Sequence, residues 1–411
     1  MEILSQRVLT MAESETLAMT RIARELKETG KDVISLSIGE PDFNTPEVVK
    51  EFAKQAIEDN WSHYPPVSGY PDLLKAISAK FKRDNNLDYS PEQIVVSTGA
   101  KQSIYQVVMS LVNPGEEVII PVPYWVSYKE IVKMANGIPV YVTARIENDF
   151  KISPAQLREA ITKKTKLIMF SSPSNPTGML YTKEELKAIA EVVKAHPQII
   201  IMADEIYEHI NFTGQHESIA QFDFIKEQVV VINGIAKGFA MTGWRIGFIG
   251  APLPIAKACS KLQGQVTSAT CSIAQRAAIK AMEMNPKTSQ DIIQMRETFK
   301  HRRDLMFELL QEIPGFKVRL PQGAFYFFPD VSELYGKNVP ADSLFAKTYG
   351  RTKIENSDDM CMYLLYDANV APVQGSAFGD DHCIRLSYAT SDTQLKEAVR
   401  RIKEAVGNLQ L

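Results

Sequence analysis

The sequence predicts an α/β fold in which a large domain, with a mainly parallel sheet between helices, is joined to a smaller α/β domain. From about residue 30, short β-branched runs alternate with amphipathic stretches, which is typical of a parallel sheet covered by helices. After about residue 286 the pattern changes to one long helical stretch over 290–312, then a few strands and a closing helix over 391–406. The 411 residues also leave room for about two or three domains at roughly 150 residues each.

The elements of the large domain follow in order from short apolar runs and helix-start signals. The runs predict strands at 94–97, 117–121, 139–143, 166–171, 199–203, 229–233 and 245–250. Helix starts are indicated by Thr45-Pro46, Pro71 and Ser153-Pro154, and 182–185 and 391–394 fit the capping box. We therefore expect a large domain over 46–285, and a small domain over 286–411 onto which residues 1–45 fold.

Composition excludes several classes of function. The 46 basic and 49 acidic residues give a formal charge of -3 without a long basic run, which argues against nucleic-acid or anionic-membrane binding. No apolar stretch approaches the ~20 residues of a membrane span, and the N-terminus lacks a leader pattern, so we expect a cytoplasmic protein. The four cysteines, Cys259, Cys271, Cys361 and Cys383, form no CxxC pair and are interpreted as ordinary thiols. We expect no metal site.

Three segments carry residues suited to chemistry. Lys237 follows a predicted strand in an apolar neighbourhood, where desolvation disfavours the charged form and favours a nucleophile or Schiff-base former. Asp204 ends an apolar strand, at the edge of the sheet where α/β proteins bind ligands. Asn175 lies between Pro173 and Pro176 after another strand. The alternatives are a solvated loop lysine, a helix N-cap and simple turn chemistry.

Taken together, these segments resemble the pyridoxal-phosphate aminotransferases of fold type I, class I. Asp204-x-x-Tyr207 precedes Lys237, Arg245 follows eight residues later, and 171–178 reads Ser-Ser-Pro-Ser-Asn-Pro-Thr-Gly. Agreement extends along nearly the whole chain, through the segments 38–43, 64–66, 99–102, 123–128 and 385–390. Within that family the chain is most similar to the Ib subgroup of aspartate and prephenate aminotransferases.

The resemblance implies pyridoxal 5'-phosphate as cofactor and assigns catalytic roles. Lys237 would form the Schiff base with the cofactor and then act as general base for the Cα proton. Asp204 would keep the pyridine nitrogen protonated. Tyr207 and Asn175 would hydrogen-bond the ring's phenolic oxygen, and Trp125 would stack on the ring, although a core tryptophan is the alternative.

The resemblance also implies a phosphate site. Arg245 and the backbone of Gly99, Ala100 and Lys101 would bind the phosphate, because that turn opens a helix whose N-terminus attracts anions. Tyr64 would reach the phosphate of the neighbouring subunit, which implies a homodimer with shared active sites.

Substrate binding is expected at a second arginine. Arg385 would pair with the substrate α-carboxylate, helped by the Gly39 backbone, whereas a surface salt bridge is the alternative. One departure from the family is Ala236, where many relatives carry serine before the lysine. We expect a modest change in cofactor affinity from that lost hydroxyl.

The side chain of the amino acid is the remaining question. In Ib aspartate enzymes a lysine matching Lys101 and hydroxyls matching Ser14 and Thr16 recognise the distal carboxylate, and both signatures are present. The resemblance therefore implies transamination between L-aspartate and 2-oxoglutarate, giving oxaloacetate and L-glutamate. Prephenate carries a second carboxylate too, so a prephenate or dual activity is the alternative. If neither residue binds substrate, Lys101 is an exposed helix residue and Ser14 caps the helix that follows it.

Two further classes remain as alternatives. A pyridoxal-phosphate-dependent β-lyase could use the same fold and lysine, although the Lys101, Ser14 and Thr16 set argues against it. A non-enzymatic sensor on this fold would carry a DNA-binding domain, and only ~30 residues precede the first strand, with no helix-turn-helix or basic stripe.

Overall fold

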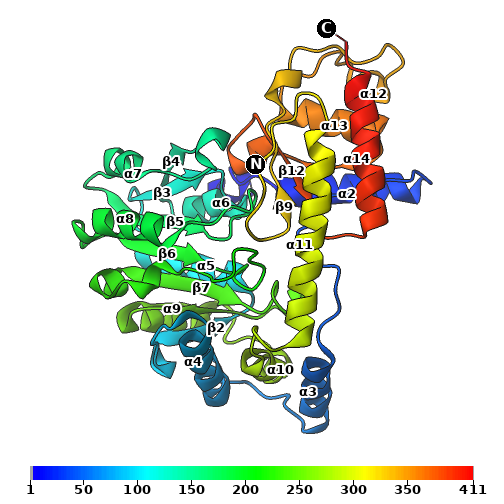
Figure 1. The fold of residues 1–411 in the computed structure, drawn as a ribbon. Coiled ribbons are helices and arrows are strands. Elements are labelled where there is room, and N and C mark those ends of the chain that lie inside the picture. Colours follow the sequence, from blue (N-terminus) through cyan, green and yellow to red (C-terminus); the bar gives the residue numbers. More distant parts are fainter. Residues whose placement is uncertain (1–2, 411) are drawn as a thin grey trace.

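The computed structural model describes residues 3–410 and contains the predicted sheet between helices (Figure 1). The seven strands lie in the order β2-β8-β7-β6-β5-β3-β4. β8 runs antiparallel to both of its neighbours, and the remaining pairs are parallel. All seven predicted strands are confirmed, as β2 (Ile94–Ser97), β3 (Glu117–Val122), β4 (Ile138–Thr143), β5 (Thr165–Ser171), β6 (Ile200–Asp204), β7 (Val229–Gly234) and β8 (Gly247–Gly250).

The start of β8 differs from the prediction of residue 245. Residues Thr242–Trp244 form a 3-10 turn, and Arg245 has a φ of 57°, in the left-handed region that no strand adopts. The strand therefore begins only at Gly247. Arg245 is placed in the turn before it, which matters for the site below.

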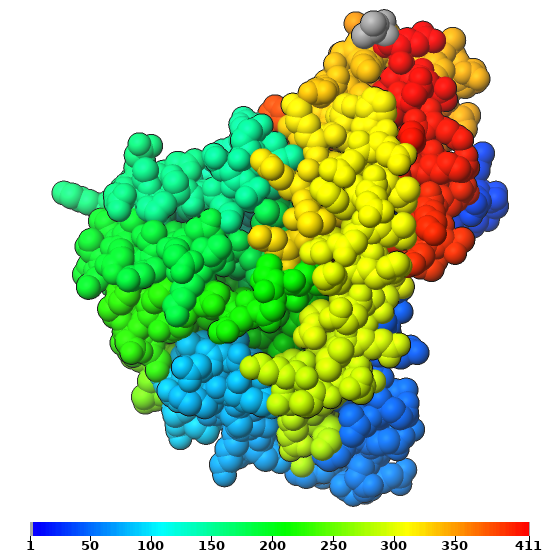
Figure 2. All heavy atoms as spheres, viewed as in Figure 1, coloured from blue at the N-terminus to red at the C-terminus, as the bar shows by residue number. Residues whose placement is uncertain are grey.

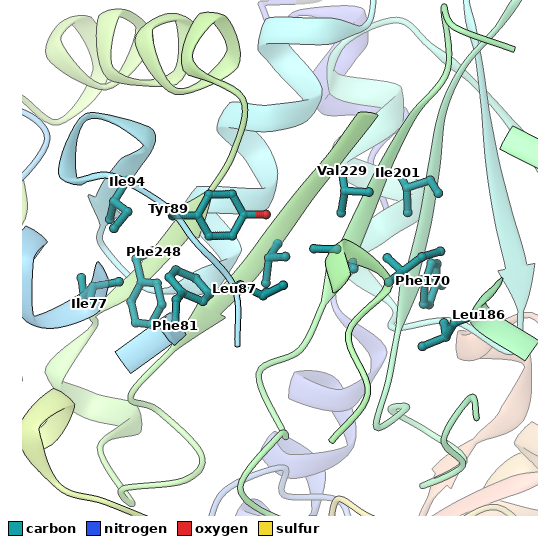
Figure 3. Packing of buried hydrophobic residues seen from close by; sticks show 14 of the residues in the cluster. Ile77, Phe81, Leu87, Tyr89, Ile94, Phe170, Leu186, Ile201, Val229 and Phe248 are labelled. Atoms are coloured by element: carbon teal, nitrogen blue, oxygen red, sulfur yellow. The ribbon is translucent and has the colours of Figure 1, made fainter. Parts of the chain in front are cut away.

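Helices cover both faces of this sheet, which explains why its central strands read as continuous apolar runs. β6 and β7 are buried along nearly their whole length. Figure 3 shows two groups of the buried side chains, one around Phe81 and Phe248, whose rings lie 5.7 Å apart, and one around Phe170 and Ile201. The packed sheet gives the strand ends that carry the site a rigid base.

The helices begin where the sequence signals indicated. α4 has Pro71 in its first turn, and α7 and α8 begin with complete capping boxes at Ser153 and Thr182. The helices of the sheet region are α3 (Glu47–Glu58), α4 (Pro71–Asn85), α5 (Ala100–Leu111), α6 (Ser127–Met134), α7 (Pro154–Ala160), α8 (Lys183–Lys194), α9 (Leu253–Val266) and α10 (Ser272–Glu283). Most of them pack against the sheet through their apolar faces, whereas α3 packs against α10.

The capping box predicted at 391–394 is only half formed. The Ser391 hydroxyl accepts a hydrogen bond from the Gln394 backbone N–H, as the box requires. The Gln394 side-chain oxygen, however, accepts from the Thr390 hydroxyl instead of from the Ser391 backbone. A nearer hydroxyl therefore replaces the backbone donor.

The N-terminal segment packs with the C-terminal part of the chain. β1 (Ile34–Ser35) pairs in parallel with β10 (Val370–Ala371), and Met19 and Leu36 share a buried cluster with Phe299 of α11. Other elements there are α1 (Gln6–Leu9), α2 (Glu15–Glu28), α11 (Gln290–Gln311), α12 (Leu344–Tyr349), α13 (Ser357–Asp367), α14 (Asp392–Gly407), β9 (Tyr326–Phe327), β11 (Val373–Gln374) and β12 (Ile384–Ser387). The boundaries at 45/46 and 285/286 stay a prediction.

The long helix α11 connects the two regions. Figure 1 shows it running from α10 and α3 at one end to the C-terminal elements at the other. Figure 2 shows its surface (yellow) beside that of α14 (red). Among residues 3–410, no helix combines the length and apolarity needed to cross a membrane.

Candidate functional site

A cavity of about 530 Å³ opens at the carboxyl ends of β5, β6 and β7. Its volume lies within the roughly 300–1,000 Å³ that is usual for small-molecule sites. The predicted residues that line it are Ser14, Thr16, Gly39, Ala100, Lys101, Trp125, Asn175, Asp204, Tyr207, Lys237, Arg245 and Arg385. The fold thus gathers into one cavity residues spread from 14 to 385.

Lys237 lies in the turn after β7, inside the cavity. Its ammonium donates a hydrogen bond to the Gly39 carbonyl and lies 5.8 Å from the ring centres of Tyr207 and Phe325. Burial lowers the pKa of Lys237 to about 8. An amine in this state can lose its proton near neutral pH, unlike a lysine solvated in a loop.

Asp204 is the last residue of β6 and is only 6 % exposed. One carboxylate oxygen accepts from the Tyr128 hydroxyl at 2.8 Å and the other from the Ile206 backbone N–H at 3.3 Å. Burial raises the pKa of Asp204 to about 6, against the effect of these two hydrogen bonds. No helix begins directly after Asp204, since the next helical element is the 3-10 turn Ile219–Gln221, so Asp204 is not a helix N-cap.

Arg385 is a buried cation without an acidic partner. It is 2 % exposed, and its Nη1 and Nη2 donate to the Asn175 side-chain oxygen at 2.9 Å and to the Ser37 carbonyl at 2.6 Å. Its Nε is buried without a hydrogen-bond partner, and within residues 3–410 the guanidinium makes no ion pair. A buried positive charge is costly unless it is paired, so this arrangement is suited to an anionic ligand.

Two tyrosines form a hydrogen-bonded pair beside Arg385. The hydroxyls of Tyr207 and Tyr326 lie 2.8 Å apart, and the Arg385 guanidinium lies 4.5 Å from the Tyr326 ring centre. Tyr326 also lies against Gly39, where an added Cβ would be 2.6 Å from the Tyr326 hydroxyl. Only glycine lets the backbone approach so closely at this position.

The opposite end of the cavity is built around the start of α5. Gly99 precedes the helix with a φ of 82°, and no side chain caps the helix N-terminus. The Arg245 guanidinium lies so close to Gly99 that a Cβ there would collide with it. Free N–H groups at a helix N-terminus together with a guanidinium form an anion site.

Lys101 and the residues from α2 form the outer rim. The Lys101 ammonium lies 5.0 Å from the Trp125 ring centre, and burial together with the nearby Arg245 lowers its pKa. Lys101 nevertheless keeps an exposed side chain. The Ser14 and Thr16 hydroxyls lie 3.0 Å apart, and Ser14 does not cap α2 with its side chain although it holds the N-cap position.

Two predicted residues do not line the cavity. Gly99 lies directly behind it, against Arg245. Tyr64 is 94 % exposed, and within one chain it does not contribute to the site. The four cysteines form no disulfide, as expected.

Sequence reasoning missed two tyrosines that contact site residues through long-range hydrogen bonds. Tyr326 lies in a run of four aromatic residues that reads as core, and nothing near it in sequence indicates its hydrogen bond to Tyr207. Tyr128 lay inside a segment already used for the resemblance, yet its bond to Asp204 was not predicted. For Tyr128, its place in that segment could have indicated a position near the site.

Comparisons with known proteins agree along the whole chain. Residues 31–402 match the family model described as aminotransferase class I and II. The chain is 46 % identical to an aspartate aminotransferase of Bacillus subtilis, covering 98 % of both chains. It is 44 % identical to a probable aspartate/prephenate aminotransferase of Rickettsia bellii, covering 100 % of both. The crystal structure of an aspartate aminotransferase from Rhizobium meliloti superposes with a TM-score of 0.93, at 39 % identity and 99 % coverage of both chains.

Proposed function

Because the chain belongs to the family of class I and II aminotransferases, we propose that it transfers the amino group of L-aspartate to 2-oxoglutarate, giving oxaloacetate and L-glutamate. The aspartate aminotransferase type of transamination is supported by the relatives named above. The choice of dicarboxylic substrates rests on one observation: besides Arg245 and Lys237, two more cationic groups line the cavity, Arg385 at its base and Lys101 at its rim.

The family depends on pyridoxal phosphate, and the donor set of the cavity fits that cofactor. Arg245 and the free N–H groups at the start of α5 would hold the phosphate, and the space that a Cβ on Gly99 would fill is already taken by the guanidinium. Trp125 would cover the ring face. When bound, pyridoxal phosphate supplies a protonated pyridine ring that accepts the electrons released at the substrate Cα.

Asp204 would hold the proton on the ring nitrogen. Its pKa of about 6 leaves the carboxylate ionised at neutral pH, and the Tyr128 hydrogen bond fixes its orientation. Tyr207 would donate to the ring oxygen. Asn175 was expected to share this role, but its side-chain oxygen accepts from Arg385, which leaves its amide N–H₂ as the group for the cofactor.

Lys237 would move the proton at the substrate Cα. An amine whose pKa is about 8 is close to the working pH, which is the optimum for a general base. The Gly39 carbonyl that accepts from its ammonium would orient the Nζ atom. The two rings beside it would limit the access of water to the reacting atoms.

Arg385 would bind the substrate α-carboxylate. Its unpaired Nε offers a free donor, and the Gly39 backbone lies within the same cavity. Lys101, with the hydroxyls of Ser14 and Thr16, would bind the distal carboxylate. A cation with hydroxyl donors is suited to a carboxylate and discriminates against substrates that lack one.

Prephenate is the second candidate substrate, because its second carboxylate would use the same rim residues. The relatives named above divide between aspartate and aspartate/prephenate activity. Since both acids need the two cationic positions, a dual activity is the alternative that we retain.

We also propose a homodimer and a two-domain protomer. Tyr64, almost fully exposed in one chain, would complete the phosphate site of a second subunit. The large domain would comprise 46–285, and 1–45 would belong with 286–411, in line with the pairing of β1 with β10.

A competition assay tests the substrate proposal. Purified enzyme with pyridoxal phosphate is given an L-glutamate donor, and kcat/KM is measured with oxaloacetate and with prephenate as acceptors. We expect the value for oxaloacetate to be higher. A clearly higher value for prephenate would overturn the aspartate assignment, and the absence of transfer to either acid would overturn the dicarboxylate proposal.

A further inference from the structure

A buried group of charged side chains lies behind the cavity, on the far side of the segment that follows β6. Asp204, Ile206 and Tyr207 line the cavity, whereas Glu205 and Glu208 contact a separate set of residues. We call this set the anchor cluster. It comprises Lys80, Glu205, Glu208, His209 and His216.

Two ion pairs hold the anchor cluster together. Lys80 of α4 and Glu208 form one pair, with side chains 1 % and 3 % exposed, and Asn85 bonds to both of them at 2.7 and 2.8 Å. In the other pair, the Nε2 atom of His216 lies 3.0 Å from one oxygen of Glu205, a distance that fits an ion pair although the two atoms are not aligned as a hydrogen bond. The second Glu205 oxygen accepts from the Ser218 hydroxyl at 2.6 Å.

The charge balance of the cluster points to a protonated His216. Lys80 neutralises Glu208, and the neighbouring Asp84 is paired with Arg83 at 2.6 Å. Glu205 then lacks a cation unless His216 carries one. Burial by itself would lower the pKa of His216, but Glu205 and then Glu208 outweigh it and raise that pKa, against the opposing effect of Lys80.

His209 behaves differently from His216. Burial lowers its pKa, its ring lies edge-on to Phe239 at 5.4 Å, and its Nε2 is 3.4 Å from Glu208, which already has a cation. A divalent metal bound by Glu205, Glu208 and His216 would add two charges beside Lys80 where one proton is enough. A proton on His216 therefore explains the charge balance of the anchor cluster better than a bound metal does.

The segment between Glu205 and His216 contacts two other parts of the chain that lead to the cavity. Ala324 donates to the Ile210 carbonyl at 2.8 Å, and Asn211 pairs with Gly323, in the turn that leads to Tyr326. Tyr326 in turn bonds to Tyr207. On the other side, His209 packs against Gly238, next to Lys237, where an added Cβ would be 2.8 Å from the His209 ring.

We propose that the ion pair of His216 and Glu205 is a positioning device for Asp204 and Tyr207. It closes the segment of residues 205–216 on itself, so that the side chains facing the cavity keep their places. It also neutralises the carboxylate next to Asp204, which would otherwise disfavour the charged form of Asp204. Both are positioning roles, since neither residue lines the cavity.

Three variants test this inference: His216→Gln, Glu205→Gln and the double variant. His301→Gln is the matched control, because His301 and Asp392 form a 2.7 Å pair that is largely exposed. The readout is the dissociation constant of pyridoxal phosphate from the apoprotein, followed by its absorption spectrum at pH 7. The inference rests on the proposed function only in using this cofactor as the probe.

We expect His216→Gln to weaken cofactor binding about tenfold, the size of coupling between contacting groups. The double variant should regain most of the affinity, because removing both charges leaves no unpaired buried carboxylate. The control should change binding less than twofold. If His216→Gln does not fold, Glu205→Gln and the double variant still give the comparison.

Urea unfolding of the apoprotein provides the second readout. Because the pKa of His216 is raised on folding, the ion pair stabilises the protein at low pH. This contribution to stability is lost as pH rises above 6.5 and through the raised pKa. The wild type should show this decline, and the double variant should show a smaller one, because it keeps only the part that the raised pKa of Asp204 causes. Three results would each overturn the proposal. They are an unchanged cofactor affinity in His216→Gln, an equal loss of affinity in the single and double variants, and a stoichiometric bound metal that His216→Gln loses. Wild-type protein that binds the cofactor but does not transaminate aspartate would contradict the proposed function alone.

Discussion

The inner part of the cavity and its outer rim are built in different ways. The inner part, formed by Lys237, Asp204 and Arg385, is largely buried, and burial shifts the pKa of each group. The rim, formed by Ser14, Thr16 and Lys101, is exposed or half-buried and is held by few contacts. Burial tunes the proton affinities that the chemistry needs, whereas a more open rim can alter substrate choice without disturbing them. We therefore expect large losses from inner substitutions and selective losses from rim substitutions.

The largest effect is expected for Lys237→Ala. The variant removes the proposed base and the only amine at the base of the cavity among residues 3–410, so transamination should fall by at least ~10⁴-fold. The visible absorption of the bound cofactor should disappear as well. Steady-state assays and an absorption spectrum measure both. A variant that keeps both the activity and the absorption would show that the catalytic role assigned to Lys237 is wrong.

Asp204→Asn should lower kcat about 100- to 1,000-fold, because a neutral amide cannot stabilise the charge on the ring nitrogen. The apoprotein should nevertheless become more stable. The pKa of Asp204 is about 6 in the folded protein and ordinarily 3.8, so ionisation costs stability as pH rises through 6. Urea unfolding at pH 7.5 should show a gain of up to about 3 kcal/mol that vanishes below pH 4.

A gain in stability of the Asp204→Asn apoprotein at pH 3.5 would contradict this assignment, since the wild-type carboxyl is then neutral. Asp392→Asn is a matched control, because Asp392 is 42 % exposed and its pair with His301 lies at the surface. It should leave kcat unchanged.

Arg385→Lys should lower kcat/KM about 10- to 100-fold, mainly through KM. Lysine keeps the charge but loses the planar fork, and the Asn175 oxygen and the Ser37 carbonyl lose the partner that bridges them. The loss should be similar for acidic and aromatic substrates, since both carry the α-carboxylate. A loss confined to acidic substrates would show that Arg385 binds the distal carboxylate instead of the α-carboxylate.

The smallest and most selective effect is expected for Lys101→Ala. Activity toward aspartate and 2-oxoglutarate should fall about tenfold, the value of one hydrogen bond to a charged group, and activity toward phenylalanine less than twofold. A panel of kcat/KM values compares the two classes. Equal losses for both classes would show that Lys101 does not read the distal carboxylate.

Strand ends located three residues of the cavity, Lys237, Asp204 and Asn175, and the resemblance to a known family located the other predicted ones. Asp204 ends β6 and Lys237 follows β7, so two adjacent parallel strands deliver them to the same edge. Residues such as Tyr326 were missed, because their place depends on contacts with segments more than 100 residues away in the chain, like the bond to Tyr207. Arg245 was found, but the local turn that moves it out of β8 was not.

By itself, the amino-acid sequence determined the sheet, most of the helix starts and the chemical types of the reactive side chains. These follow from local periodicity, capping residues and the order of motifs. Only the tertiary structure decided which groups are buried and which lie beside one another. Burial gives Lys237 and Asp204 their shifted pKa values, and packing leaves Arg385 without an acidic partner and brings His216 to Glu205. These properties depend on the neighbours that folding assembles, which no local pattern in the chain encodes.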